Sequence, residues 1–296
     1  MNIEIIEVGP RDGLQNEKIP IPTETKISFI KSLAQAGLKE IEVTSFVSPK
    51  WVPQLSDATE VLAGLTPSPF YSVLVPNQTG LKRALLSPID RIALFTAASD
   101  AFTLKNIAKT VDESLQEFRL VIEEFRQEKP NGYVRGYVST IFECPFAGKV
   151  ETNQVVKVID ALFEMGVDEI SLGDTIGVGV PKEVKVLADA INHVVKSKVA
   201  WHFHDTRGTA IANVAEALEQ GYFRFDSSAA GLGGCPYAPG AGGNLATEDL
   251  VYFVERSGMS TGVNIDLLIK SSLPVLELLG KKPFSKVQQA LLSKLQ

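Results

Sequence analysis

The segment WHFHD, residues 201–205, contains two of the three histidines of the chain. An apolar run, residues 199–201, leads into it, and a turn and a helix-like segment, residues 206–219, follow it, which predicts a strand, a turn and a helix. Side chains alternate between the faces of a strand, so His202 and His204 are expected to point the same way. Two imidazoles on one face at the carboxyl end of a strand can chelate a metal ion, although the pattern also fits a solvated strand face.

This strand–turn–helix unit is one of eight along the chain. The predicted strands are 3–8, 40–44, 71–75, 91–95, 133–142, 169–172, 199–203 and 225–230, and the predicted helices are 23–36, 56–63, 78–86, 107–128, 153–165, 182–195, 209–219 and 245–255. Eight such units over about 255 residues predict an α/β fold, a closed TIM (β/α)8 barrel with appended C-terminal helices. An open doubly wound sheet usually has fewer units and a glycine-rich phosphate turn that the segment GPRDG, residues 9–13, does not match. We expect residues 1–262 to form the barrel and residues 263–296 a helical extension packed on it.

The amino-acid composition favours a globular enzyme over a nucleic-acid-binding or membrane protein. Hydrophobic residues make up 45% of the 296 residues and charged residues 22%, which is ordinary for a globular enzyme. A net charge of −6 argues against a broad nucleic-acid surface, and no apolar stretch is long enough to span a bilayer. The two cysteines, Cys144 and Cys235, make no disulfide framework, so we expect a cytoplasmic protein without a nucleic-acid or membrane partner.

In a barrel of this kind, catalytic groups gather at the carboxyl ends of the strands. The polar residues predicted there are Arg11, Asp12, Gln15, Glu42, Asp174, Thr175, His202, His204 and Asn244. Asp12 and Asn244 can add two oxygen ligands to the two imidazoles, a mixed set that suits Mg²⁺, Mn²⁺ or another divalent ion with positions left open for substrate. Asp12 also fits a tight turn before glycine, and Asn244 also fits the N-cap of the last barrel helix.

Arg11 and the glycine-rich loop, residues 231–244, offer further chemistry. Arg11 can stabilise a developing oxyanion or enolate, or form a salt bridge at the mouth of the barrel. Cys235 lies on the loop, where a thiol suits proton delivery to a reacting carbon, whereas most free cysteines are small buried hydrophobes. We assign that second role to Cys144.

Four motifs resemble those of the 3-hydroxy-3-methylglutaryl-CoA lyase family, and the resemblance runs nearly from end to end. They are EVGPRDGLQNE at residues 7–17, TSFVSPKWVPQ at 44–54, SLGDTIG at 171–177 and GLGGCPYA at 231–238. The last of these is highly specific, whereas the His-x-His-Asp segment is shared with isopropylmalate and homocitrate synthases. Arg207 departs from the usual tyrosine of the family, and it could contact a distal part of the substrate or pair with an acid such as Glu248.

The resemblance implies a divalent-metal-dependent retro-Claisen lyase. The substrate would be 3-hydroxy-3-methylglutaryl-CoA or a close 3-hydroxy-3-methylacyl-CoA, and the products acetyl-CoA and acetoacetate, as in leucine catabolism and ketone-body formation. By match of position, Asp12, His202, His204 and Asn244 would hold Mg²⁺ or Mn²⁺, Arg11 would stabilise the enolate and Cys235 would protonate it. The residues implied to line the substrate site are Gln15, Glu42, Asp174 and Thr175, together with Arg11. His202 and Asp12 are both candidates for the base, and a homo-oligomer, dimer or tetramer, is expected.

Two other functions remain open at this point. An isopropylmalate-synthase-like condensing enzyme usually carries a long C-terminal regulatory region and lacks the loop motif at residues 231–238. A catalytically silent barrel that binds acyl-CoA or metal would be expected to have lost some of these candidate ligands or the loop thiol, and all of them are present.

Overall fold

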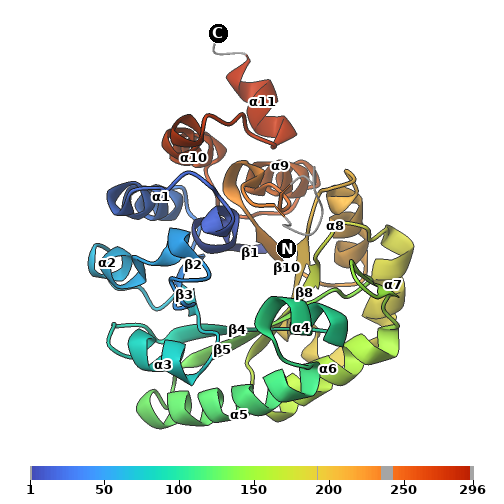
Figure 1. Cartoon of the computed structure of the whole chain (residues 1–296). Helices are drawn as coiled ribbons and strands as arrows, with labels where there is room; N and C mark the ends of the chain where they lie inside the picture. Colours follow the sequence, from blue (N-terminus) through green and yellow to red (C-terminus); the bar gives the residue numbers. More distant parts are fainter. Residues whose placement is uncertain (1, 192, 235–242, 294–296) are drawn as a thin grey trace.

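The computed structural model describes residues 2–191, 193–234 and 243–293. Eight parallel strands close into a barrel, and each strand is hydrogen-bonded to its neighbours along the chain (Figure 1). The barrel strands are β1 (Glu4–Glu7), β2 (Glu40–Ser45), β3 (Tyr71–Leu74), β4 (Arg91–Ala97), β5 (Tyr133–Ser139), β8 (Glu169–Asp174), β9 (Val199–Phe203) and β10 (Arg224–Ser227). The predicted TIM barrel is therefore confirmed, and β10 pairs with β1 to close it.

Helices surround the barrel and cover its outer face (Figure 1). Those that follow the strands are α1 (Thr23–Gln35), α2 (Ala58–Ala63), α3 (Gln78–Ala84), α5 (Val111–Glu128), α6 (Thr152–Glu164), α7 (Pro181–Ala190), α8 (Ala210–Glu219) and α9 (Thr247–Arg256). The helix α6 shows why they form, because Val155, Val158, Ile159 and Leu162 recur at helical spacing and are buried. Burial of such apolar stripes against the outward-facing strand residues fixes the ring of helices around the sheet.

Two connections differ from the sequence-based prediction. The predicted helix 107–128 is α5, which begins at Val111, and it is preceded by an additional helix, α4 (Asp100–Ile107), that was not predicted. Ala108, which is left-handed with a φ of 55°, ends α4. Thr110 then starts α5 with a capping box, since its side chain accepts the N–H of Glu113 at 3.2 Å. The predicted strand 133–142 ends at Ser139 and is followed by a short antiparallel hairpin of β6 (Glu143–Cys144) and β7 (Gly148–Lys149).

The remaining helices, α10 (Ile265–Leu279) and α11 (Lys286–Leu292), lie beside α9, and α10 also packs against α1 (Figure 1). The link between them reaches the barrel mouth, because the N–H of Phe284 donates to the carbonyl of Ala230 at 2.9 Å. Ala230 belongs to the turn after β10, so the extension braces a loop at the carboxyl ends of the strands. Among the described residues, no helix has the length and apolar character needed to cross a membrane.

Candidate active site

His202 and His204 point to the same side of the strand β9. Their Nε2 atoms lie 3.2 Å apart, as the two-residue alternation of a strand predicts. His202 is the fourth residue of β9, and His204 follows the strand directly, where it forms an isolated bridge with Asn244. The pair therefore lies at the carboxyl end of the barrel, where enzymes of this fold place their chemistry.

A single π-turn after β1 presents Asp12 to the two histidines. In this turn, η1 (Gly9–Gly13), the carbonyl of Val8 accepts the N–H groups of Arg11, Asp12 and Gly13 at 3.2, 2.7 and 3.2 Å. One ligand atom from each of Asp12, His202 and His204 lies within 4.8 Å of the others. The turn reading of Asp12 is thus compatible with the ligand reading, because π-turns occur often at functional sites.

Asn244 reaches the same cluster through a short antiparallel contact with the end of β9. The N–H of Leu245 donates to the carbonyl of Phe203 at 2.9 Å, and the N–H of Asp205 donates to the carbonyl of Gly243 at 3.1 Å. The side-chain Nδ2 of Asn244 then donates to Asp12 Oδ2 at 2.9 Å. The N-cap interpretation of Asn244 is wrong, because α9 begins at Thr247 and Ala246 is its N-cap.

The chemistry of these four residues fits a divalent cation. Burial opposes the charge of Asp12, but Arg11, His202 and His204 lower the pKa of its carboxyl to about 2, so it is ionised. Burial, with the neighbouring His202, lowers the pKa of His204 to about 4, so its ring is neutral and keeps a lone pair. The Oδ1 atom of Asn244 is buried without a hydrogen-bond partner among the described residues. An anionic carboxylate, neutral imidazoles and a free amide oxygen form a donor set that Mg²⁺ or Mn²⁺ accepts.

Arg11 is buried beside this cluster, and its orientation is held from two sides. Its Nε donates to Glu42 on β2, and its Nη1 lies 2.5 Å from Asp12 Oδ1. The hydroxyl of Tyr137 donates to the second oxygen of Glu42 at 3.0 Å, and the guanidinium carbon of Arg11 lies 5.2 Å from the Tyr137 ring centroid. The predicted salt bridge at the mouth exists, and it fixes a permanent cation next to Asp12.

Asp174 and Thr175 lie at the end of β8, where their contacts hold loops. The carboxylate of Asp174 accepts the N–H groups of Val178 and Gly179 at 3.0 and 2.9 Å, and burial raises its pKa to about 6 despite these bonds. Thr175 Oγ1 accepts the N–H of Thr140 at 2.8 Å, which ties this end of β8 to the loop after β5. Both residues are at the predicted strand end, but their polar contacts are separate from those of Asp12.

The three other predicted residues have different outcomes. Gln15 lies two residues after the end of η1 and is half-buried. Cys235 lies outside the described residues. Arg207 is exposed, and its Nη1 donates to the carbonyls of Ile176 and Gly177 at 2.7 and 3.1 Å. The predicted pairing of Arg207 with Glu248 is wrong, because Glu248 is fully buried and its carboxylate accepts the N–H of Ala230.

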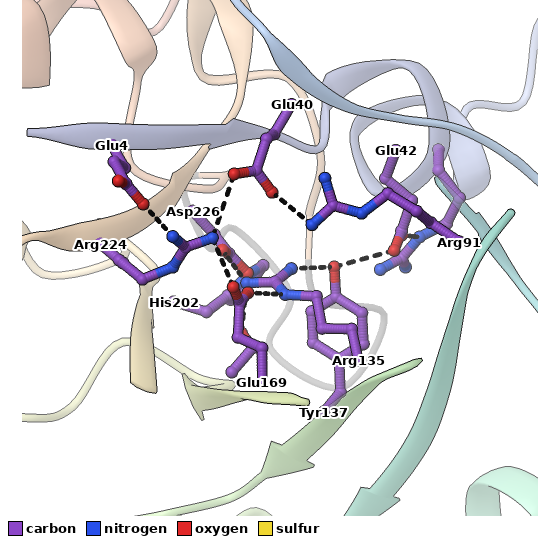
Figure 2. A network of polar contacts seen from close by, with 12 residues as sticks. Glu4, Glu40, Glu42, Arg91, Arg135, Tyr137, Glu169, His202, Arg224 and Asp226 are labelled. Carbon is purple, nitrogen blue, oxygen red and sulfur yellow. Dashed lines mark hydrogen bonds and ion pairs between the residues drawn. The ribbon is translucent and has the colours of Figure 1, made fainter. Parts of the chain in front are cut away.

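The barrel interior contains charged residues that the sequence-based reasoning missed. Figure 2 shows a chain of ion pairs and hydrogen bonds that runs from Glu4 and Arg224 through Glu169, Arg135 and Asp226 to His202. The interior of such a barrel is commonly filled by branched apolar side chains, so this network is a departure. A signal was available, because polar residues recur two positions apart on several strands. These pairs are Glu40 and Glu42, Arg135 and Tyr137, and Arg224 and Asp226.

Comparison with known proteins places this chain in a family. The family model described as HMGL-like matches residues 2–273. The mitochondrial hydroxymethylglutaryl-CoA lyase of Bos taurus is 49% identical over 97% of this chain and 89% of its own length. A 3-hydroxy-3-isohexenylglutaryl-CoA/hydroxymethylglutaryl-CoA lyase of Pseudomonas aeruginosa is 46% identical over 99% of this chain and 98% of its own.

Solved structures agree with these relatives. The crystal structure of hydroxymethylglutaryl-CoA lyase from Pseudomonas aeruginosa matches with a TM-score of 0.95 and 46% identity, over 99% of this chain and 98% of that one. A lyase from Acinetobacter baumannii in complex with coenzyme A and 3-methylmalate matches with a TM-score of 0.91 and 38% identity, over 98% and 95%. On the fold, the loop motifs and these matches together, the chain belongs to the hydroxymethylglutaryl-CoA lyase family.

Proposed function

We propose that the protein cleaves 3-hydroxy-3-methylglutaryl-CoA to acetyl-CoA and acetoacetate, as a carbon–carbon lyase. The observation that carries this proposal is the convergence of Asp12, His202 and His204 within 4.8 Å, beside the buried cation Arg11. The lyases named among the relatives, and the related structure that holds coenzyme A, support an acyl-CoA substrate.

The proposed metal ligands are Asp12, His202, His204 and Asn244. A divalent ion bound there would make the tertiary hydroxyl of the substrate more acidic and fix its orientation. We infer Mg²⁺ or Mn²⁺, because the donor set combines oxygens with imidazoles and contains no thiolate among the described residues.

The residues of the chain then divide the work of a retro-Claisen cleavage. A base removes the proton of the tertiary hydroxyl, the bond between the carbinol carbon and the acetyl-CoA methylene breaks, and the oxygen becomes the ketone of acetoacetate. The electron pair of the broken bond passes to acetyl-CoA as an enolate, which the fixed guanidinium of Arg11 stabilises. Cys235 donates a proton to the enolate carbon and completes acetyl-CoA.

The base is one of the two candidates, Asp12 or His202, and both are also proposed metal ligands. Burial opposes the charge of Asp12, but Arg11, His202 and His204 lower the pKa of its carboxyl to about 2, so it holds a proton weakly. His202 turns Nδ1 towards Asp226 and Nε2 towards the cluster, so the lone pair of Nε2 cannot bind the ion and take a proton at the same time. Glu42 keeps Arg11 in place, while Gln15, Asp174 and Thr175 are proposed to line the substrate site.

The condensing alternative is not favoured, because the relatives and solved structures named above, at 38–49% identity over nearly the whole chain, are lyases. The Pseudomonas aeruginosa relative carries the names of two acyl-CoA substrates, so a longer branched acyl group is the nearest competitor to hydroxymethylglutaryl. A place in leucine catabolism and ketone-body formation, a cytoplasmic location and a dimeric or tetrameric state remain predictions.

The test is release of acetyl-CoA and acetoacetate from hydroxymethylglutaryl-CoA, measured with and without EDTA. We expect chelation to abolish cleavage and Mg²⁺ or Mn²⁺ to restore it. His204→Ala should lose metal binding while its urea unfolding midpoint stays close to that of the wild type. Full activity in excess EDTA would remove the metal from the mechanism. Release of free CoA from acetyl-CoA and a 2-keto acid, with no cleavage of hydroxymethylglutaryl-CoA, would instead favour the condensing enzyme.

A further inference from the structure

Asp226 lies in the barrel interior directly beside His202 (Figure 2). The two residues are register partners on the adjacent strands β10 and β9, so the barrel itself sets their separation. Asp226 Oδ2 lies 3.0 Å from His202 Nδ1 and 2.7 Å from the hydroxyl of Ser171, and its Oδ1 accepts Nη2 of Arg135. The Asp226 residue is 1% exposed, so water does not compete for these bonds.

These contacts decide where the hydrogen of the His202 ring lies. A carboxylate that is paired with an arginine accepts hydrogen bonds and donates none, so the atom facing it must be a donor. His202 therefore carries its hydrogen on Nδ1, and Nε2 keeps the lone pair. That Nε2 faces His204 Nε2 at 3.2 Å, on the side where Asp12 lies. His204 has no equivalent support, because its Nδ1 is buried without a partner among the described residues.

We propose that Asp226 is a positioning residue that holds His202 in the tautomer able to bind the metal through Nε2. This inference rests on the metal site of the proposed function, and it adds a residue that the sequence motifs do not mark. Ser171 and Arg135 orient Asp226 in turn, so the geometry of the site depends on the interior network of Figure 2. Carboxylates behind ligating histidines fix ring orientation and tautomer in this way in many metal sites.

The isosteric variant Asp226→Asn separates this role from packing. Arg135 requires an acceptor at the Oδ1 position, so the amide oxygen is expected to face Arg135. The amide nitrogen then faces Ser171 and His202 Nδ1, and it donates to Nδ1. The ring hydrogen must move to Nε2, where it blocks the metal.

Two readouts test this without any substrate. A two-bond ¹H–¹⁵N correlation spectrum of the metal-free, full-length chain reports which ring nitrogen carries hydrogen, and three histidines can be assigned with single His→Gln variants. Titration with Mn²⁺, followed by the electron paramagnetic resonance signal of the free ion, reports affinity. We expect hydrogen on Nδ1 of His202 in the wild type and on Nε2 in Asp226→Asn. The affinity of the variant for Mn²⁺ should fall by about 10- to 100-fold.

The matched control is Glu169→Gln. Glu169 is buried in the same network, where it pairs with Arg135 and Arg224 and accepts the hydroxyl of Tyr133 at 3.0 Å. This variant also removes one buried negative charge next to Arg135. We expect Glu169→Gln to leave the His202 tautomer and the affinity for Mn²⁺ unchanged. If the effect of Asp226→Asn came from a general disturbance of the network, Glu169→Gln would change both as well.

Several results would overturn the proposal. In the wild type, hydrogen on Nε2 of His202 would do so. In Asp226→Asn, either an unchanged His202 tautomer or a changed tautomer with unchanged Mn²⁺ affinity would do so. Equal changes in tautomer and Mn²⁺ affinity in Asp226→Asn and Glu169→Gln would also contradict it. If Asp226→Asn does not fold, the wild-type spectrum still tests the proposal, because it shows which ring nitrogen of His202 carries hydrogen. A wild type that binds Mn²⁺ with the expected tautomer but does not cleave hydroxymethylglutaryl-CoA would reject the proposed function and leave this inference standing.

Discussion

At the scale of single residues, the two cysteines allow a matched comparison. Cys144 is 1% exposed, and its Sγ accepts the N–H of Phe146 at 3.4 Å, so it serves packing. Cys235 is predicted to deliver the proton to the enolate. Cys235→Ser should lower kcat by about 10²–10⁴-fold with little change in substrate binding, since the loss occurs in the transition state. The matched control is Cys144→Ala, and steady-state kinetics of the two variants check the prediction. A loss of kcat in Cys144→Ala as large as in Cys235→Ser would show that the roles are misassigned.

At the scale of elements, the segment at Gly243 and Asn244, which pairs with the end of β9, packs closely against the backbone of Gly231 and Gly233. A Cβ on Gly243 would lie 2.2 Å from the carbonyl oxygen of Gly231 and 2.7 Å from that of Gly233, and backbone atoms cannot move aside cheaply. Gly243→Ala should therefore displace Asn244 and weaken Mn²⁺ binding. Gly234→Ala is the control in the same loop, because a Cβ there meets nothing within 4 Å among the described residues. Equal Mn²⁺ affinity in the two variants would mean that Asn244 does not depend on this passage.

At the scale of the whole molecule, a single buried carboxylate joins the first strand of the barrel to the segments that follow the last strand. Glu7, at the end of β1, accepts the N–H groups of Gly9 and Ala229 at 2.8 and 3.0 Å and the hydroxyl of Thr247 at 2.7 Å. Burial raises the pKa of Glu7 from its ordinary 4.5 to about 7, although these hydrogen bonds oppose the shift. The η1 turn, which carries Asp12, and the turn after β10 are thus held by one carboxyl group.

This raised pKa predicts how stability changes with pH. Between about pH 4.5 and pH 7 the folded chain binds a proton at Glu7 that the unfolded chain has released, so this contribution is complete below that range and is lost as the pH rises through it. The variant Glu7→Gln has no titratable group at this position, so it serves as the reference. The free energy of unfolding of the wild type minus that of Glu7→Gln should fall by roughly 2–3 kcal/mol from about pH 5 to about pH 8. Urea unfolding at several pH values measures the difference, and a flat or rising difference would contradict the prediction.

The order of strands and helices was predictable from the sequence, because the alternation of a strand and the stripe of a helix are local periodicities. The same alternation correctly placed the two imidazoles of His202 and His204 on one side of β9. The helix α4 was missed, and the predicted helix after it began too early, since Ala108 ends α4 in a left-handed conformation that a glycine would usually mark. Strand ends were also displaced by a few residues where the turns are irregular, as after Ser139.

The sequence by itself therefore determined the barrel, its eight units and the residue types at the mouth. Only the tertiary structure decided which of them meet. Asn244 contacts Asp12 across 232 positions of the chain, and Asp226 contacts His202 across the register of β10 and β9. Such pairings follow from the closure and stagger of the barrel, which depend on all strands together and leave no periodic signal at any one position. For the same reason the sequence left Asn244 as either a helix cap or a metal ligand, and Asp226 resembled an ordinary strand residue, until the strands were brought side by side.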